Sequence, residues 1–205
     1  MSEPTRLVLV PGLGLDERSS ARLRRRCPAD VVLLPGMGLA EPVPPLDELA
    51  RRLLDAIGPG PVVLVGHSQS CQVVAAAATD PRMRSVVVLP WRWLRTALRE
   101  NWAQAPLVLA QWWRTGPRAM RALWQAAAPD RIDRRLAGVT VPVTVVCGTR
   151  DRLCPPDWAV QVCAAAPRGR LVEIPGAAHM TVHTHPDAVA RVVADAAGLR
   201  DGVAG

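Results

Sequence analysis

The 205-residue chain contains no lysine, no phenylalanine and no tyrosine. All 25 of its basic residues are therefore arginine, and its seven tryptophans are the only large aromatic side chains. Hydrophobic residues make up 49% of the chain and charged residues 21%, which excludes an intrinsically disordered protein. This length and composition indicate one compact domain with a substantial core.

The sequence also lacks paired cysteines and long apolar runs. Its five cysteines are odd in number, and with the four histidines they form neither C-x-x-C pairs nor zinc-ligand spacings. We therefore expect reduced thiols and no metal site. The first apolar run covers only residues 7–10, and no segment of membrane-spanning length is free of charges. These absences predict a cytoplasmic protein with neither a signal peptide nor a membrane span.

Short apolar runs alternate with segments of helical periodicity along the chain, a pattern typical of a parallel sheet covered by helices. The expected strands are residues 7–10, 31–34, 62–65, 85–89, 143–147 and 170–174. The expected helices are residues 46–57, 71–78, 156–166 and 187–199. The sequence therefore predicts an α/β protein with helices on both faces of a mainly parallel sheet.

An insertion at residues 90–135 separates the fourth and fifth expected strands. It has helical periodicity, is broken at Pro106 and at Gly116-Pro117, and carries no strand signal. An insertion of this length in a compact domain usually has a function of its own. We expect a core formed by residues 1–89 and 136–205, with the helical insertion as part of a single structural domain.

Gly66-His67-Ser68-Gln69-Ser70 follows an expected strand and precedes an expected helix. This is the context of a nucleophile elbow, a turn so tight that the residues two before and two after the serine must be small. Gly66 meets that requirement, while Ser70 replaces the usual second glycine. The alternative interpretation is an ordinary Gly-Ser turn at the end of a strand.

A nucleophilic serine needs a base, and the base needs an acid that orients it. Asp151 follows the fifth expected strand and His179 follows the sixth, so the order along the chain is serine, acid, histidine. Taken singly, Asp151 could cap a turn or a helix, and His179 could be a solvated loop residue. Their coincidence with the elbow predicts a catalytic triad of Ser68, His179 and Asp151.

Four other residues compete for these roles or lie beside them. His183 and His185 are the alternative bases, although His185 precedes Pro186 and is more typical of a surface or capping position. Asp157 would replace Asp151 only if the strand assignment were wrong. His67, next to the serine, is expected to be structural.

The chain resembles the α/β-hydrolase superfamily over nearly its whole length, and four segments carry the resemblance: residues 9–14, 65–70, 141–151 and 176–179. Larger members begin with an antiparallel hairpin that is missing here, so the resemblance implies a reduced sheet of about six strands. It also implies that the insertion is a helical cap over the active site. An oxyanion hole, the pair of N–H groups that stabilises charge on the reacting oxygen, would come from Leu13 and Gln69.

Six of the seven tryptophans lie in the insertion. Helical spacing places Trp91 and Trp102 on one apolar face, and a second apolar stripe runs through Met120 and Trp124. These side chains either attach the cap to the core or line an apolar acyl pocket. The candidates for substrate contact are Trp91, Trp93, Trp112 and Trp124.

The insertion also carries most of the net positive charge. Residues 90–135 contain nine arginines against three acidic residues, in a chain with a formal net charge of +7. One interpretation is an ordinary solvated surface. The other is a docking surface, including Arg92, Arg95 and Arg99, for an acidic acyl carrier protein or for the phosphates of coenzyme A. No nucleic-acid-binding motif accompanies the charge, so nucleic acid is not expected as a partner.

Together these features predict a serine hydrolase that cleaves an ester or thioester of a hydrophobic acyl substrate through an acyl-enzyme, without a metal or organic cofactor. A thioesterase or cyclase in a biosynthetic pathway is one form of this prediction. The first alternative is a non-hydrolytic enzyme on the same fold, catalysing a lyase reaction, C–C bond cleavage or cyclisation. The second is a ligand-binding module without turnover, which a complete triad disfavours.

Overall fold

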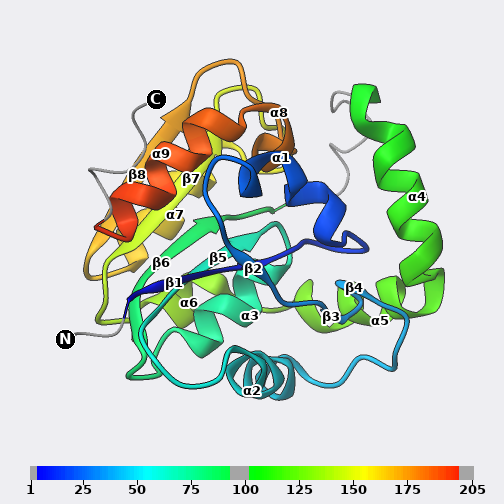
Figure 1. The fold of residues 1–205 in the computed structure, drawn as a ribbon, viewed down its shortest axis with the longest axis horizontal. Helices are drawn as coiled ribbons and strands as arrows, with labels where there is room; N and C mark the ends of the chain where they lie inside the picture. Colours follow the sequence, from blue (N-terminus) through cyan, green and yellow to red (C-terminus); the bar gives the residue numbers. More distant parts are fainter. Residues whose placement is uncertain (1–3, 93–101, 199–205) are drawn as a thin grey trace.

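The computed structural model describes residues 4–92 and 102–198. Its main sheet has six parallel strands in the order β2-β1-β5-β6-β7-β8 (Figure 1). The strands of this sheet are β1 (Arg6–Val10), β2 (Asp30–Val31), β5 (Val62–His67), β6 (Met83–Leu89), β7 (Val143–Gly148) and β8 (Gly169–Ile174). The prediction of a reduced sheet of about six parallel strands is confirmed.

Helices connect these strands and cover the sheet. The α-helices are α1 (Ala21–Arg24), α2 (Leu46–Ile57), α3 (Ser70–Ala77), α4 (Ala105–Thr115), α5 (Pro117–Ala127), α6 (Ile132–Leu136), α7 (Pro156–Ala165), α8 (Thr181–Thr184) and α9 (Pro186–Ala196). Two short 3-10 helices are η1 (Glu17–Ser20) and η3 (Trp102–Gln104). No helix in the described ranges is long and apolar enough to span a bilayer. All five cysteine thiols are free.

Both faces of the main sheet are buried under helices (Figure 1). Along β1, Val8 and Val10 belong to a core that includes residues of α2, α3, α6 and α7, whereas Leu7 and Leu9 belong to a core with α1 and α9. This division follows from the alternation of side chains along a strand. Because helices cover both faces, the central strands β1, β5 and β6 are rich in buried apolar residues, and the predicted arrangement is confirmed.

The second expected strand, residues 31–34, is divided in the structure. β2 covers only Asp30–Val31 and pairs with β1, whereas β3 (Leu34–Pro35) pairs in parallel with β4 (Gly38–Leu39) in a separate two-stranded sheet. Leu34 exchanges two backbone hydrogen bonds with Met37, at 3.0 and 2.8 Å, around a turn in which Gly36 has a φ of 79°. The prediction of one continuous strand here is wrong for that reason.

The described parts of the insertion, residues 90–92 and 102–135, contain helices and no strand. Gly116 separates α4 from α5, as the sequence predicts, but Pro106 lies in the first turn of α4 instead of breaking it. Proline is tolerated there because the first helical N–H groups have no partner within the helix. Figure 1 shows α4 standing beside the sheet, where it contacts η1 and β4.

The expected boundary of the insertion falls inside α6. Ile132 and Leu136 of this helix are buried in the same core as α3 and α7. The division of the chain into a core and a cap stays a prediction, and α6 is the element that connects the two.

Candidate active site

The carboxyl ends of the parallel strands bring the predicted residues to one edge of the sheet. β5 lies between β1 and β6 and runs directly into Ser68. β7 and β8 are neighbours at one side of the sheet, and Asp151 and His179 lie in the loops that follow them. Ligands of open parallel sheets bind beyond the carboxyl ends of the strands, so this edge is the candidate active site.

Ser68 lies in a strained turn between β5 and α3. Its φ of 60° makes it the only non-glycine residue with a positive φ in the described part of the chain. Such a conformation costs roughly 1–3 kcal/mol and persists only where the surrounding structure fixes it. Here the N–H of Ser68 donates to the carbonyl of Leu89 at 2.8 Å, and the carbonyl of Ser68 accepts from the N–H of Cys71 at 3.1 Å.

Ser70, which replaces the second glycine of a nucleophile elbow, is fully buried. Its hydroxyl accepts a hydrogen bond from the N–H of His67 at 2.9 Å and donates to the carbonyl of Val10 at 2.7 Å. The hydroxyl therefore joins the turn to the end of β1. The departure from glycine is accommodated because the added oxygen satisfies two backbone groups.

Ser68, His179 and Asp151 form one hydrogen-bonded line. The distance from His179 Nε2 to Ser68 Oγ is 2.9 Å, and the distance from His179 Nδ1 to Asp151 Oδ2 is also 2.9 Å. An ionised carboxylate can only accept, so Nδ1 carries the proton and the lone pair of Nε2 faces the hydroxyl. This is the geometry in which an imidazole can take the proton of a serine.

The second oxygen of Asp151 holds its own loop. Oδ1 accepts from the N–H of Leu153 at 2.8 Å and from the N–H of Cys154 at 2.9 Å. One carboxylate oxygen therefore fixes the loop while the other faces His179. The backbone N–H groups of the loop therefore fix the position of the Asp151 carboxylate.

The loops of Asp151 and His179 are also tied to each other. The N–H of Arg150 donates to the carbonyl of Ala177 at 2.8 Å. Gly148, at the end of β7, allows this approach, since a β-carbon there would lie 2.3 Å from the same carbonyl oxygen. The spacing between acid and base is thereby set by the backbone of neighbouring strands.

The loop after β1 packs directly on Ser68. A β-carbon at Gly12 would lie 2.9 Å from the β-carbon of Ser68. The carbonyl of Gly12 accepts from the N–H of Leu15 at 3.0 Å, and in a trans peptide the N–H of Leu13 points the opposite way. Within the described residues, neither the N–H of Leu13 nor the N–H of Gln69 has a hydrogen-bond partner. Two unpaired N–H groups therefore lie in the segments that adjoin the serine.

Comparison with known proteins identifies the family. The model of the alpha/beta hydrolase family matches residues 7–192, which is most of the chain. The chain belongs to the alpha/beta hydrolase family. The predicted α/β-hydrolase fold is thereby confirmed.

Solved structures of low sequence identity share the fold of this alpha/beta hydrolase. A hydrolase from Oleispira antarctica has a TM-score of 0.80 and 15% identity, with 97% of this chain and 92% of that chain covered. A lipase-esterase related protein from Clostridium acetobutylicum has a TM-score of 0.77 and 15% identity, with 94% of each chain covered.

One curated relative is much longer than this alpha/beta hydrolase. The polyketide synthase ThaQ from Burkholderia thailandensis is 30% identical to this chain over an alignment of 241 positions. The alignment covers 89% of this chain and 11% of that protein. The chain thus spans about a tenth of the length of the curated relative it matches.

His67 supports the loop of His179 in this alpha/beta hydrolase. Its Nε2 lies 3.0 Å from the carbonyl oxygen of His179, and because a carbonyl only accepts, Nε2 carries the proton. Burial, and then the neighbouring charge of His179, lowers the pKa of His67 to about 4. His67 is therefore a neutral donor near pH 7, in agreement with the structural role expected from the sequence.

Replacing His67 with glutamine is expected to weaken the pH dependence of stability. Between the folded pKa of about 4 and the ordinary value of 6.5, the unfolded chain binds more protons at this position, so stability falls as the pH falls. The loss attributable to His67 is on the order of 2 kcal/mol from pH 7 to pH 5. Urea unfolding at both pH values measures it, with His185→Gln as the control. An unchanged loss in His67→Gln would contradict the assignment.

Trp91 and Trp124, two of the four candidates for substrate contact, pack together beside α3, the helix that follows Ser68. The ring centroids of Trp91 and Trp124 are 4.8 Å apart. With its amide oriented to satisfy both partners, Gln72 accepts from the indole N–H of Trp91 at 3.3 Å and donates to the carbonyl of Gln69 at 2.6 Å. This connects the tryptophan pair to the residue that follows Ser68.

The other candidates of the insertion have different positions. The indole N–H of Trp112 donates to the carbonyl of Leu13 at 3.2 Å, so this side chain contacts the loop after β1. Trp93 lies outside the described residues, as do Arg95 and Arg99 of the expected docking surface.

His183 and Asp157, the alternatives to His179 and Asp151, have other contacts. His183 is buried on α8, which packs on η1 and α1. Asp157 lies in the first turn of α7, 4.0 Å from Arg92, whose guanidinium lies 4.7 Å from the ring centroid of Trp158. Arg92 is therefore held against the core.

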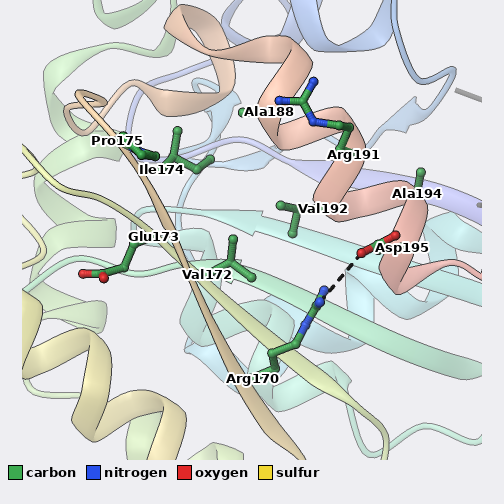
Figure 2. Close-up of a pocket in the computed structure, with 10 residues that line it drawn as sticks. All are labelled: Arg170, Val172, Glu173, Ile174, Pro175, Ala188, Arg191, Val192, Ala194 and Asp195. Atoms are coloured by element: carbon green, nitrogen blue, oxygen red, sulfur yellow. Dashed lines mark ion pairs between the residues drawn. The ribbon is translucent and has the colours of Figure 1, made fainter. Parts of the chain in front are cut away.

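A pocket of about 520 Å³ lies away from the candidate site, between the edge strand β8 and α9 (Figure 2). Its wall includes an ion pair of 3.7 Å between Arg170 and Asp195. None of the predicted site residues lines it. Across residues 4–92 and 102–198, no three His, Cys, Asp or Glu side chains are grouped as a metal site.

Proposed function

We propose that this alpha/beta hydrolase transfers the acyl group of an ester or thioester to water through an acyl-enzyme on Ser68. The observation that carries the proposal is the line of two 2.9 Å hydrogen bonds from Ser68 through His179 to Asp151, at the carboxyl edge of the sheet. Each of the three side chains has the partner that its role requires.

In the first half of the reaction, Ser68 Oγ bonds to the acyl carbon while His179 Nε2 takes the hydroxyl proton. The carbonyl electron pair moves to the oxygen, where the N–H groups of Leu13 and Gln69 stabilise the charge. The bond to the leaving group then breaks, and the leaving oxygen or sulfur receives the proton from His179. Asp151 stabilises the imidazolium between the two transfers.

In the second half, water replaces the leaving group. His179 takes a proton from the water as its oxygen bonds to the acyl carbon, and the Ser68 Oγ–acyl bond breaks with return of that proton to the serine. A hydroxyl group of the acyl chain can replace the water, and the product is then a cyclic ester. Neither half requires an oxidant, a reductant or a metal.

The thioester form of the proposal draws on two observations. The chain is similar to a segment of a polyketide synthase, and polyketide assembly proceeds through acyl thioesters. The exposed side chains of α4 and the first turns of α5 include the apolar Leu109 and Trp113 and the basic Arg118 and Arg121, which we call the docking face. Trp113 is 89% exposed and Leu109 56% exposed, and residues 102–129 contain no acidic side chain. Exposed tryptophan and arginine side chains are frequent anchors of interfaces, so this face suits an acidic acyl carrier protein.

Labelling with a fluorophosphonate probe tests the nucleophile, because the probe reacts with activated serines. The wild-type protein is expected to be labelled at Ser68, and Ser68→Ala is expected to be inert. Labelling that survives this substitution would contradict the assignment. A labelled wild type that hydrolyses neither p-nitrophenyl esters nor acyl thioesters would instead favour non-hydrolytic chemistry or binding.

The docking face is tested by comparing two forms of one acyl group. Octanoyl acyl carrier protein and octanoyl-N-acetylcysteamine carry the same thioester, but only the first offers an acidic protein surface. Trp113→Ala with Arg118→Glu and Arg121→Glu is expected to lower kcat/KM about 100-fold on the carrier substrate and less than twofold on the small thioester. The control is Arg84→Glu, near the amino end of β6. Equal losses on both substrates would refute the docking face.

A further inference from the structure

One face of α4 is hydrogen-bonded to the loop between β1 and η1, residues 11–16. The indole N–H of Trp112 donates to the carbonyl of Leu13 at 3.2 Å, and the hydroxyl of Thr115 donates to the carbonyl of Gly14 at 3.0 Å. These two side chains are three residues apart on the helix and therefore share a face. The insertion thus binds two consecutive peptide groups of the loop.

Gln111, one turn before Thr115, adds a third bond. Its Oε1 accepts from the N–H of Asp16 at 2.7 Å, and its Nε2 donates to the carbonyl of Leu107 at 3.1 Å. The second bond orients the amide, so that its oxygen is presented to the loop. Gln111 and Thr115 are both fully buried.

The indole of Trp112 also covers the loop sterically. A β-carbon at Gly14 would lie 2.5 Å from Trp112 Cδ1. The loop is held on its other side by the elbow, since a β-carbon at Gly12 would lie 2.9 Å from that of Ser68. It is therefore enclosed between the nucleophile and α4.

The bonds to α4 leave the N–H of Leu13 unused, in a loop from which the reaction needs a donor. The carbonyl groups of Leu13 and Gly14 and the N–H of Asp16 are taken by α4, whereas the N–H of Leu13 has no partner in the described part of the chain. An oxyanion donor acts only if its position is fixed before charge develops. Without the bonds to α4, the loop keeps the bond from the N–H of Leu15 to the carbonyl of Gly12 and the bond from the N–H of Gly14 to the carbonyl of Gly36. We therefore expect the N–H of Leu13 to be held less tightly, not released.

We propose that Trp112, Thr115 and Gln111 are positioning residues that hold the N–H of Leu13 in place as an oxyanion donor. The insertion is then part of the catalytic apparatus and not only a cover, and Trp112 has a polar role beside the apolar contact expected from the sequence. This inference rests on the proposed acyl transfer at Ser68. It assigns the three residues no contact with the substrate.

Paired variants separate positioning from packing. Thr115→Val keeps the shape of the side chain and removes the hydroxyl, whereas Thr115→Ser keeps the hydroxyl. Trp112→Phe removes the indole N–H, and the control is Val160→Ala, because Val160 is an exposed apolar side chain on α7 with no role in the proposed site. With p-nitrophenyl hexanoate as substrate, Thr115→Val and Trp112→Phe are each expected to lower kcat about tenfold and to change KM less than twofold. This loss is smaller than the loss that follows complete removal of an oxyanion donor, because the N–H of Leu13 is still present. Thr115→Ser and Val160→Ala are expected to match the wild type.

The second readout is inhibition by an aliphatic trifluoromethyl ketone, to whose carbonyl carbon Ser68 Oγ adds while the carbonyl oxygen becomes an oxyanion. Its affinity is expected to fall about tenfold in Thr115→Val and Trp112→Phe and to recover in Thr115→Ser. A loss of kcat with unchanged ketone affinity overturns the inference, as does an equal loss in Thr115→Val and Thr115→Ser. Failure of the wild type to react with a fluorophosphonate would instead count against the acyl transfer itself.

Discussion

Replacement of His179 by alanine is expected to lower kcat on any hydrolysed acyl ester by about 10⁴-fold or more, with the fold retained. The reason is that Ser68 Oγ has its hydrogen bond to His179 Nε2 at 2.9 Å and loses its proton acceptor in this variant. Steady-state rates on p-nitrophenyl esters measure the loss, and a thermal unfolding midpoint confirms that the variant is folded.

The matched control for this variant is His183→Ala. Both histidines are buried and follow β8, but His183 lies on α8 against η1 and α1. It is expected to retain kcat within a few-fold of the wild type. A loss in His183→Ala as large as that in His179→Ala would mean that the base has been assigned to the wrong residue.

Replacement of Asp151 by asparagine is expected to lower kcat by about 10³- to 10⁴-fold. The amide oxygen can keep the bonds that Oδ1 accepts from Leu153 and Cys154, so the loop retains its shape. The amide nitrogen then faces His179 Nδ1 and donates to it, which moves the imidazole proton to Nε2. The ring can no longer accept the proton of Ser68.

Two comparisons make the Asp151 prediction specific. Asp157→Asn is expected to be as active as the wild type, because Asp157 lies at the start of α7 with its side chain 76% exposed. The rate of Asp151→Asn is expected to remain low across the pH range where the wild type is active. A kcat within tenfold of the wild type would show that the carboxylate does not set the tautomer of His179.

The grouping of Ser68, Asp151 and His179 was predictable because their positions depend on local features. Each of Ser68, Asp151 and His179 follows a strand that is rich in β-branched and other apolar residues, and the carboxyl ends of parallel strands meet at one edge of the sheet. The Gly66-to-Ser70 segment also encodes its own turn. The fit of Ser70 was not predictable, since its hydroxyl bonds to Val10, which is distant in the sequence.

Two sequence predictions are wrong, namely the strand at residues 31–34 and the helix break at Pro106, and the structure gives a physical reason for each. The apolar run at residues 31–34 has the composition of a strand, yet only Asp30–Val31 pairs with β1, because Leu34 is bonded to Met37 in the turn at Gly36. Pro106 was expected to break a helix and instead begins one, since the first turn needs no N–H.

The contacts of α4 were beyond sequence reasoning. Trp112 and Trp113 are neighbours with the same side chain, but Trp112 bonds to the loop after β1 and Trp113 is 89% exposed. Which of them faces the core depends on how α4 is placed against a segment about 100 residues earlier in the chain. Gln111 and Thr115 had no feature that set them apart from ordinary polar residues of a helix.

The central claim is that acyl transfer passes through a covalent bond to Ser68. Its most direct test is to mix the protein with a p-nitrophenyl ester, quench with acid within the first turnover, and locate the acyl group by mass spectrometry of the peptides. The proposed reaction predicts a burst of p-nitrophenol stoichiometric with the protein and an acyl group on the peptide that contains Ser68. Turnover with the acyl group on a different peptide, or with no covalent intermediate in the quenched protein, would contradict it.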